Sequence, residues 1–189
     1  ITRGHRFLGR NQIEVFSIED YFKQLSKNSV VLDQNVRKEA IKAQAEEVAK
    51  SLGGEVEIED DLLEEITYLV EYPTAFYGEF NADYVKLPKE VVTTPMKEHQ
   101  RYFPVSKDGK LLPYFIAVRN GDKNGIETVK AGNEKVLEAR LADALFFYDE
   151  DIKKPLESFV ENLKTVVFQA KLGTVYDKTL RIEKLASDI

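Results

Sequence analysis

The sequence has no cysteine, no tryptophan and a single methionine among its 189 residues. Without cysteine, the chain can form neither a disulfide bond nor a thiolate metal site. Its histidines, His5 and His99, are only two and lie far apart in the sequence, which disfavours the common zinc sites. We therefore expect no metal in this chain, and the absence of cysteine also favours a cytoplasmic location.

Long apolar runs are missing as well. No segment approaches the roughly 20 apolar residues that a membrane-spanning helix needs, and the polar, basic start of the chain contains no apolar signal core. We expect no membrane partner. The chain begins without methionine and ends within an amphipathic pattern over residues 180–186, so we expect it to be an internal fragment of a longer protein.

Sequence motifs of catalysis are also lacking. There is no phosphate-binding loop, G-x-G-x-x-G, H-E-x-x-H, serine elbow or neighbouring His-Asp pair. Adjacent carboxylates such as Asp60 and Asp61 are explained by helix caps and solvated turns. His99 could act as a base or a phosphate contact, although a solvent-facing or structural histidine is the simpler interpretation. We expect no catalytic residue in this chain.

The formal net charge of −6 conceals a strong segregation of charge along the chain. Residues 51–72 contain eight acidic residues and no lysine or arginine, whereas residues 1–10 contain Arg3, Arg6 and Arg10 and no acid. Residues 95–125 carry six basic and three acidic side chains. Local basic surfaces could contact phosphates, although an ordinary mixed surface explains the same composition.

Residues 33–80 show alternating helix and strand patterns. Asp33 is a good N-cap for a helix that the glycine pair at 53–54 can end. Residues 55–59 alternate in polarity like a short edge strand, and Asp61 with Glu64 resembles a capping box for a helix that runs to about Tyr72. Residues 74–80 have the aromatic composition of a strand.

The strongest strand signal lies in residues 102–119. Two β-rich runs, 102–106 and 111–119, flank Asp108 and Gly109, a dipeptide typical of tight hairpins. The two runs should therefore pair antiparallel, with Pro104 and Pro113 at edges, ends or bulges. Before them, Pro88 can open a helix as its first residue, and Pro95 should end or kink that helix.

After residue 121 the pattern becomes helical almost to the end, with interruptions at about 149–155 and at 173. The order of elements predicts an α+β fold with an antiparallel sheet and packed helices, followed by a helical C-terminal arm. We expect the α+β body to span residues 1–150 and the arm to span residues 151–189. The boundary is placed at the acidic turn that follows residue 149.

Residues 132–147, GNEKVLEARLADALFF, combine two stripes in one helical pattern. The first is apolar and typical of a buried face. It contains Leu137, Leu141, Ala144, Leu145 and Tyr148. The second stripe places a cation and a carboxylate between apolar neighbours, as in a shielded structural ion pair or a contact surface with another protein. It contains Val136, Arg140, Asp143 and Phe147.

The aromatic residues of the middle region allow two interpretations. With Lys97 and Arg101 nearby, they could form stacking platforms for unpaired bases. On the strands of an α+β domain, however, such side chains more often belong to the core. The residues concerned are Phe76, Tyr77, Phe80, Tyr102, Phe103, Tyr114 and Phe115.

Several long strings, in a fixed order, carry a resemblance to a known family. They are TRGHRF (2–7), LVEYP (69–73), MKEHQRYFPV (96–105), GKLLPYFIAVRNG (109–121), GNEKVLEARLADALFF (132–147) and TVVFQAKLGTVYDKTLRI (165–182). Together they closely resemble the β subunit of the bacterial two-subunit glycyl-tRNA synthetase. The resemblance extends over nearly the whole chain.

This resemblance implies a role within a larger enzyme. In that family two α and two β subunits together attach glycine to its tRNA, using ATP and magnesium. The α subunit holds the catalytic core, and the β subunit supplies most of the tRNA recognition. The body at 1–150 is similar to the editing-type module of phenylalanyl-tRNA synthetase, and the arm would lead toward a downstream helical domain. The fragment itself is expected to need no cofactor and to be inactive alone.

Three functions follow from the resemblance together with the residues. The first is a noncatalytic structural segment that contacts glycine tRNA through basic side chains. Its candidate contacts are Arg3, His5, Arg6, Lys97, His99 and Arg101. The second is a scaffold that positions the α subunit and the remaining β-subunit domains through the mixed stripe, without touching tRNA. The third, hydrolytic editing, has no motif in its favour.

Overall fold

The structure is a computed structural model that describes all residues from 1 to 189. Its backbone contacts divide the chain into two compact units, Ile1–Leu145 and Phe146–Ile189, which are described separately here. The longest helix, α5 (Ile126–Asp151), contains both this division and the boundary predicted at residues 150 and 151. No helix in either unit is long and apolar enough to cross a membrane.

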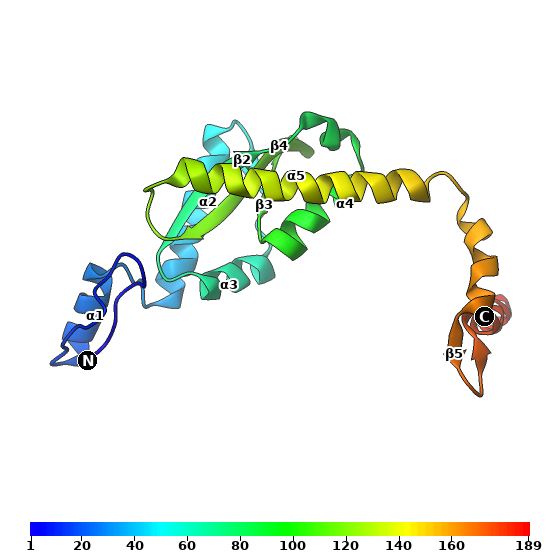
Figure 1. The fold of residues 1–189 in the computed structure, drawn as a ribbon, viewed down its shortest axis with the longest axis horizontal. Helices are drawn as coiled ribbons and strands as arrows, with labels where there is room; N and C mark the ends of the chain where they lie inside the picture. Colours follow the sequence, from blue (N-terminus) through cyan, green and yellow to red (C-terminus); the bar gives the residue numbers. More distant parts are fainter. The chain divides into compact units, whose positions relative to one another are not determined.

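A four-stranded antiparallel sheet forms the centre of the first unit (Figure 1). Its spatial order is β1-β3-β4-β2, and β4 pairs with β2 over seven residue positions. The strands are β1 (Glu55–Val56), β2 (Pro73–Glu79), β3 (Phe103–Lys107) and β4 (Lys110–Asn120). The predicted α+β class is confirmed.

The β3–β4 hairpin forms where the sequence predicts it. Asp108 and Gly109 have φ values of 50° and 76°, the left-handed conformations that a tight hairpin turn requires. The pairing of the two strands shifts register between Pro104 and Ser106, opposite the part of β4 that contains Pro113. Both prolines therefore lie at an irregularity, where their missing N–H groups interrupt no regular ladder.

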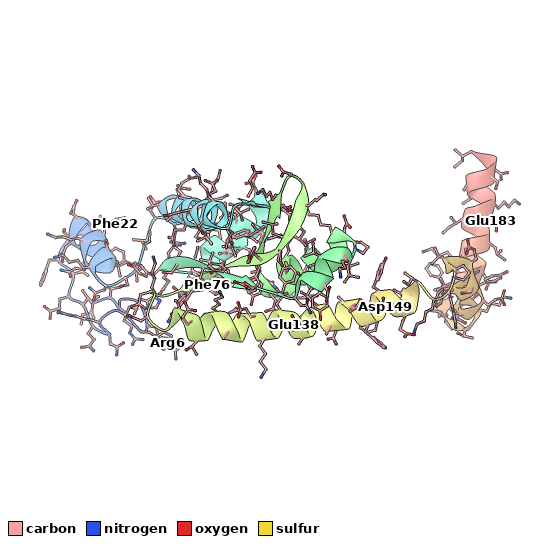
Figure 2. The ribbon with its side chains drawn as sticks, turned by 90° about the horizontal axis from the view of Figure 1, so that it is seen from above. Arg6, Phe22, Phe76, Glu138, Asp149 and Glu183 are labelled. Atoms are coloured by element: carbon pink, nitrogen blue, oxygen red, sulfur yellow. The ribbon has the colours of Figure 1, made fainter.

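Helices cover both faces of the sheet. α2 (Gln34–Ser51) and α3 (Asp60–Leu69) pack on one face, where Ile41 and Ile66 contact a cluster that includes Phe103 and Ile116. α4 (Lys89–Thr94), a π-helix, η2 (Pro95–Gln100), and α5 pack on the opposite face together with the short helix η1 (Ala82–Lys86). Phe76 lies in this second layer (Figure 2).

The helix boundaries correct three sequence predictions. α3 begins after Glu59, whose side chain makes no cap hydrogen bond, so the predicted capping box of Asp61 and Glu64 is wrong. The strand predicted at residues 55–59 is limited to Glu55–Val56, because α3 already starts at Asp60, although the Glu57 N–H still donates to the carbonyl of Pro104 in β3. Pro88 is the N-cap of α4 rather than its first residue. The prediction for Pro95 is confirmed, because α4 ends at Thr94 and a π-helix follows from Pro95.

Residues 1–33, which precede α2, form a small substructure within the first unit. Its only helix, α1 (Ile18–Lys27), is capped by the side chain of Ser17, and Thr2 pairs with Ile13 in an isolated antiparallel bridge. The Val31 N–H donates to the carbonyl of Glu71 at 2.8 Å, which attaches this substructure to the segment that enters β2.

The second unit contains a hairpin that the sequence patterns did not predict. Following α5, the 3-10 helix η3 (Leu156–Thr165) leads into β5 (Val167–Gln169) and β6 (Gly173–Thr174), which pair antiparallel. The final helix, α6 (Val175–Asp188), starts with a capping box between Thr174 and Asp177. The helical arm is thus present but is interrupted by two short strands, too short to show a period of two.

Gly78 and Phe115 form the tightest contact in the sheet. They face each other in the β2–β4 ladder, and the Phe115 ring is fully buried. A Cβ atom added to Gly78 would lie 2.2 Å from Cζ and 2.5 Å from Cε1 of this ring. Only glycine therefore leaves room for the ring in its present position.

We expect Gly78→Ala to destabilise the fold by about 1–3 kcal/mol, because the Phe115 ring would have to leave its position. Gly132→Ala is a matched control, since a Cβ at this exposed position in α5 meets no atom within 4 Å. In a helix interior this change should be stabilising by roughly 0.5–1 kcal/mol. Urea unfolding of both variants tests the contact, and equal stability of the two would contradict it.

Candidate functional site

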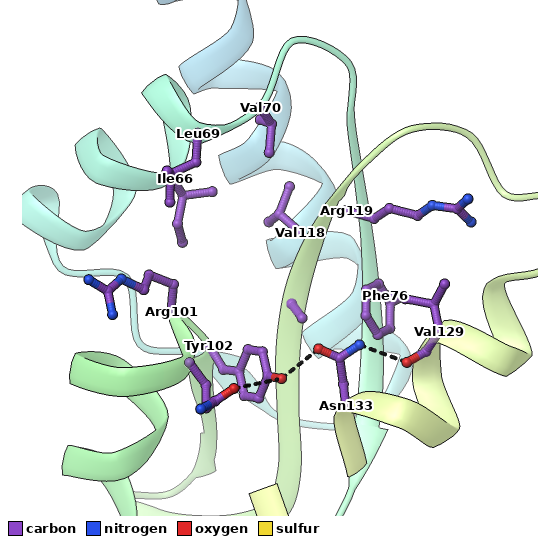
Figure 3. Close-up of a pocket in the computed structure, with 12 residues that line it drawn as sticks. Ile66, Leu69, Val70, Phe76, Arg101, Tyr102, Val118, Arg119, Val129 and Asn133 are labelled. Carbon is purple, nitrogen blue, oxygen red and sulfur yellow. Dashed lines mark hydrogen bonds between the residues drawn. The ribbon is translucent and has the colours of Figure 1, made fainter. Parts of the chain in front are cut away.

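A pocket of about 340 Å³ opens between α3, the sheet and the first turns of α5 (Figure 3). Ile66, Leu69 and Val70 line one side, while Phe76 and Val129 line another. The polar part of the lining comes from the segment that follows the π-helix and from α5. It consists of Gln100, Arg101, Tyr102 and Asn133. Ala117, Val118 and Arg119 of β4 complete the lining.

The end of the π-helix positions Gln100, Arg101 and Tyr102 at the pocket. Arg101 follows its last residue with a φ of 56° and a ψ of 44°, a left-handed conformation that ends the helix. Tyr102 N–H bonds back to the carbonyl of Met96 at 3.0 Å, which closes the wide turn. The chain then enters β3, with Gln100 and Tyr102 both reaching the pocket. π-helical turns occur often at functional sites.

Tyr102 connects the sheet to α5. Its ring stacks on Phe115 at a centroid distance of 4.5 Å, and its hydroxyl donates to Asn133 Oδ1 at 2.5 Å. Asn133 Nδ2 in turn donates to the carbonyl of Val129 at 2.7 Å. Burial raises the pKa of Tyr102 to about 12. At neutral pH the phenol therefore keeps its proton and acts as a hydrogen-bond donor.

The lining of the pocket is mostly apolar, and its polar groups are amides, guanidinium groups and one phenol. No carboxylate, histidine, serine or threonine lines it, and the tyrosine hydroxyl is held protonated. General-base and nucleophilic catalysis both need such a group within hydrogen-bond reach of the substrate. The structure also contains no cluster of acidic or histidine side chains that could hold a metal ion.

The segregated charges of the sequence pair with one another in the fold. Three cations from α4 and the end of the π-helix meet three carboxylates of the acidic segment 51–72. The pairs are Lys89–Glu57 at 2.6 Å, Lys97–Glu59 at 2.6 Å and Arg101–Glu65 at 2.8 Å. Two candidate RNA contacts, Lys97 and Arg101, are therefore already paired with carboxylates.

The two histidines have different surroundings. His5 is only 2% exposed, and its backbone N–H donates to the carbonyl of Asn28. Its Nδ1 accepts a hydrogen bond from the Phe7 N–H, so Nε2 carries the proton and donates to Asn120 Oδ1 at 3.1 Å. This arrangement corrects the prediction of a tRNA-contacting His5, because the side chain is inside the fold. His99 is exposed on the π-helix, and the predicted contact there stays a prediction.

The N-terminal arginines, which include the predicted contacts Arg3 and Arg6, are accessible to solvent. Arg3, Arg6 and Arg10 are exposed, and none of them forms an ion pair. The Arg6 guanidinium lies 5.5 Å from the ring centre of Phe7, which is itself 81% exposed. Figure 2 labels Arg6 within this segment. A flat cation beside an open aromatic ring can receive both phosphates and bases.

The two stripes of α5 differ in burial. Leu137 and Leu141 are fully buried, as predicted, although Ala144, Leu145 and Tyr148 are only half-buried. In the second stripe, Val136 is 45% and Phe147 63% exposed. Arg140 and Asp143 are exposed and form no ion pair, so the predicted shielded structural pair is wrong. The contact-surface interpretation stays a prediction.

Fold and pocket together describe an α+β domain with a partly apolar pocket beside its sheet. Comparison with known protein families identifies the family of this chain. The family described as "Glycyl-tRNA synthetase beta subunit" matches all residues from 1 to 189, so the chain belongs to this family.

Individual relatives agree with this assignment. A glycine–tRNA ligase beta subunit of Clostridioides difficile (strain 630) is 75% identical over 189 residues, which are 100% of this chain and 28% of the relative. The corresponding subunit of Syntrophomonas wolfei is 53% identical over 186 residues, 98% of this chain and 27% of the relative. The chain thus spans little more than a quarter of the length of these relatives.

The buried phenol of Tyr102 predicts a pH dependence of stability. Its pKa is raised from 10.0 to about 12, so between these values the folded chain keeps a proton that the unfolded chain has lost. The free energy of unfolding should therefore fall as the pH rises from 10 to 12. In Tyr102→Phe the slope of the free energy of unfolding against pH should be shallower, by the amount that corresponds to up to about one proton per molecule.

Urea unfolding of the unchanged chain and of Tyr102→Phe at several pH values between about 8 and 12, a range that contains both pKa values, measures these slopes. Tyr68→Phe serves as the control, because Tyr68 is 61% exposed. Identical slopes for Tyr102→Phe and the unchanged chain would contradict the burial of the phenol.

Proposed function

We propose that this chain is a noncatalytic, RNA-contacting segment of a glycine–tRNA ligase β subunit. The complete enzyme would attach glycine to its tRNA with ATP and magnesium, and its α subunit would supply the active site. The relatives carry the name of that ligase subunit, and most of their length lies outside the segment that matches this chain. The α subunit, glycine tRNA and the remaining β-subunit domains are the proposed partners, in the cytoplasm.

The observation that carries this proposal is the arginine segment at residues 1–10. Its three arginines are exposed and unpaired, in a chain whose net charge is −6. By contrast, the cations of the π-helix region are neutralised by the acidic segment. Phosphate recognition needs accessible cations, and a free guanidinium can bind a phosphate through two parallel hydrogen bonds. Arg3 and Arg6 are accordingly the leading contacts.

Contacts with phosphates position the RNA on the protein but do not read its base sequence. Neutralising phosphates releases counterions, so the affinity for tRNA should fall steeply as salt is added. Selection of the glycine tRNA would then come from other parts of the enzyme. Hydrolytic editing receives no support, because the pocket lacks a general base or nucleophile.

The double variant Arg3→Gln with Arg6→Gln tests the proposal in a titration with glycine tRNA at several salt concentrations. We expect the slope of log K against log salt to become shallower by about one for each arginine that contacts a phosphate. The control is Lys86→Gln with Lys153→Gln, which removes the same charge from side chains that are 79% and 60% exposed. Equal slopes for the two double variants, or no tRNA binding at low salt, would refute the proposed contact.

A second candidate function is a scaffold for subunit assembly. Arg140 and Asp143 are exposed and unpaired, and they share a stripe with the exposed Phe147. This favours the scaffold function, because interfaces are enriched in arginine and aromatic side chains. Such a surface would face the α subunit or the other β-subunit domains.

For this function, Arg140→Ala should weaken copurification of the complete β subunit with the α subunit while leaving the stability of the chain within about 0.5 kcal/mol. Lys135→Ala, at an exposed neighbouring position of α5, is the control. Normal assembly of the Arg140→Ala subunit would exclude this residue from the interface.

A further inference from the structure

We infer that the pocket between α3, the sheet and α5 receives one unpaired nucleobase of a bound RNA. This inference rests on the proposed function and deepens it, because the arginine segment would supply affinity without reading any base. The pocket volume of about 340 Å³ lies at the lower end of the range for small-molecule sites. It therefore suits a single flat group better than a large ligand.

The walls of the pocket match the faces of a base. Ile66 and Leu69 come from α3, Val118 comes from β4, and Val129 comes from α5. These apolar side chains, together with Phe76, enclose the space from more than one side (Figure 3). A base has two apolar faces and is bound by stacking or packing on such surfaces when it leaves a helix.

The polar part of the pocket matches the edge of a base. Side-chain amides offer a donor and an acceptor together, the combination that base edges present. Asn133 uses its oxygen for Tyr102 and one N–H for the carbonyl of Val129, which fixes its orientation and leaves its second N–H. Gln100 makes only a long contact of 3.5 Å with the Tyr102 hydroxyl, so its amide nitrogen is unused.

The charge around the pocket suits the phosphate that accompanies a base. Arg101 and Arg119 extend on opposite sides of it (Figure 3). Arg101 bonds to Glu65 and to the carbonyl of Glu98, and Arg119 donates one hydrogen bond to the carbonyl of Asn124. Because Glu65 neutralises Arg101, the cation that remains for a phosphate is Arg119, which forms no ion pair and uses only one of its five N–H donors. No carboxylate lines the pocket itself.

The test compares two RNA probes of equal charge. One is a short single-stranded RNA that contains all four bases, and the other has the same length and phosphates but carries abasic sites throughout. Fluorescence anisotropy at low salt measures the affinity of the 189-residue chain for each. We expect the RNA with bases to bind roughly tenfold more tightly, the effect of about one stacked base.

Gln100→Leu identifies the pocket as the source of that difference. It keeps the size of the side chain and removes the amide, and the half-buried glutamine has no short hydrogen bond whose loss would harm the fold. Gln12→Leu makes the same change at an exposed position away from the pocket. Thermal unfolding of both variants checks that their folds are intact.

Three results are possible. A preference for the RNA with bases that Gln100→Leu reduces severalfold and Gln12→Leu leaves intact supports the base pocket. Equal binding of the two RNAs, or a preference that Gln100→Leu does not change, overturns the base pocket but leaves phosphate contact by the arginine segment in place. Failure of both RNAs to bind overturns the base pocket and the proposed RNA contact together.

Discussion

The packing of Phe115 against Gly78 and Tyr102 is the constraint on which the first unit depends. The ring occupies the space above a glycine in the neighbouring strand and stacks on the tyrosine at 4.5 Å. This position directs the Tyr102 hydroxyl toward Asn133, and so the sheet is connected to α5 through a chain of hydrogen bonds. The pocket lies where α3, the sheet and α5 meet. A displaced ring would therefore alter the core, the helix contact and the pocket at once.

Pairing between distant charged segments is the second organising feature. The acidic segment 51–72 and the cations of α4 and the π-helix are far apart in sequence, but the pairing of β1 with β3 brings them together. As partly exposed pairs, they contribute little stability each. Their main effect is on the surface, because they neutralise these cations and leave the arginine segment at residues 1–10 as a separate cationic region.

Local signals in the sequence predicted much of the fold. The N-cap at Asp33, the Asp108-Gly109 turn and the buried positions Leu137 and Leu141 depend on neighbouring residues or on one helical period, and the structure confirms them. The π-helix after Pro95 and the β5–β6 hairpin were not predicted, because neither has a strong local pattern.

The candidate site could be predicted only in part. Residue type alone suggested that His5 contacts RNA, whereas its partners Asn28 and Asn120 are remote in sequence and place it inside the fold. The pocket was missed for the same reason, since its lining comes from five separate parts of the chain. Tyr102 and Phe76 were recognised as either core or stacking residues, and they both belong to the core and border the pocket.

Membership in the glycyl-tRNA synthetase β-subunit family gives these surfaces a context. The most direct test of RNA contact is hydrogen exchange of the backbone amides, measured by mass spectrometry with and without glycine tRNA. The proposed contacts predict slower exchange in residues 1–10 and 96–102 and no change in α2. Protection confined to α5, or no protection anywhere, would contradict them.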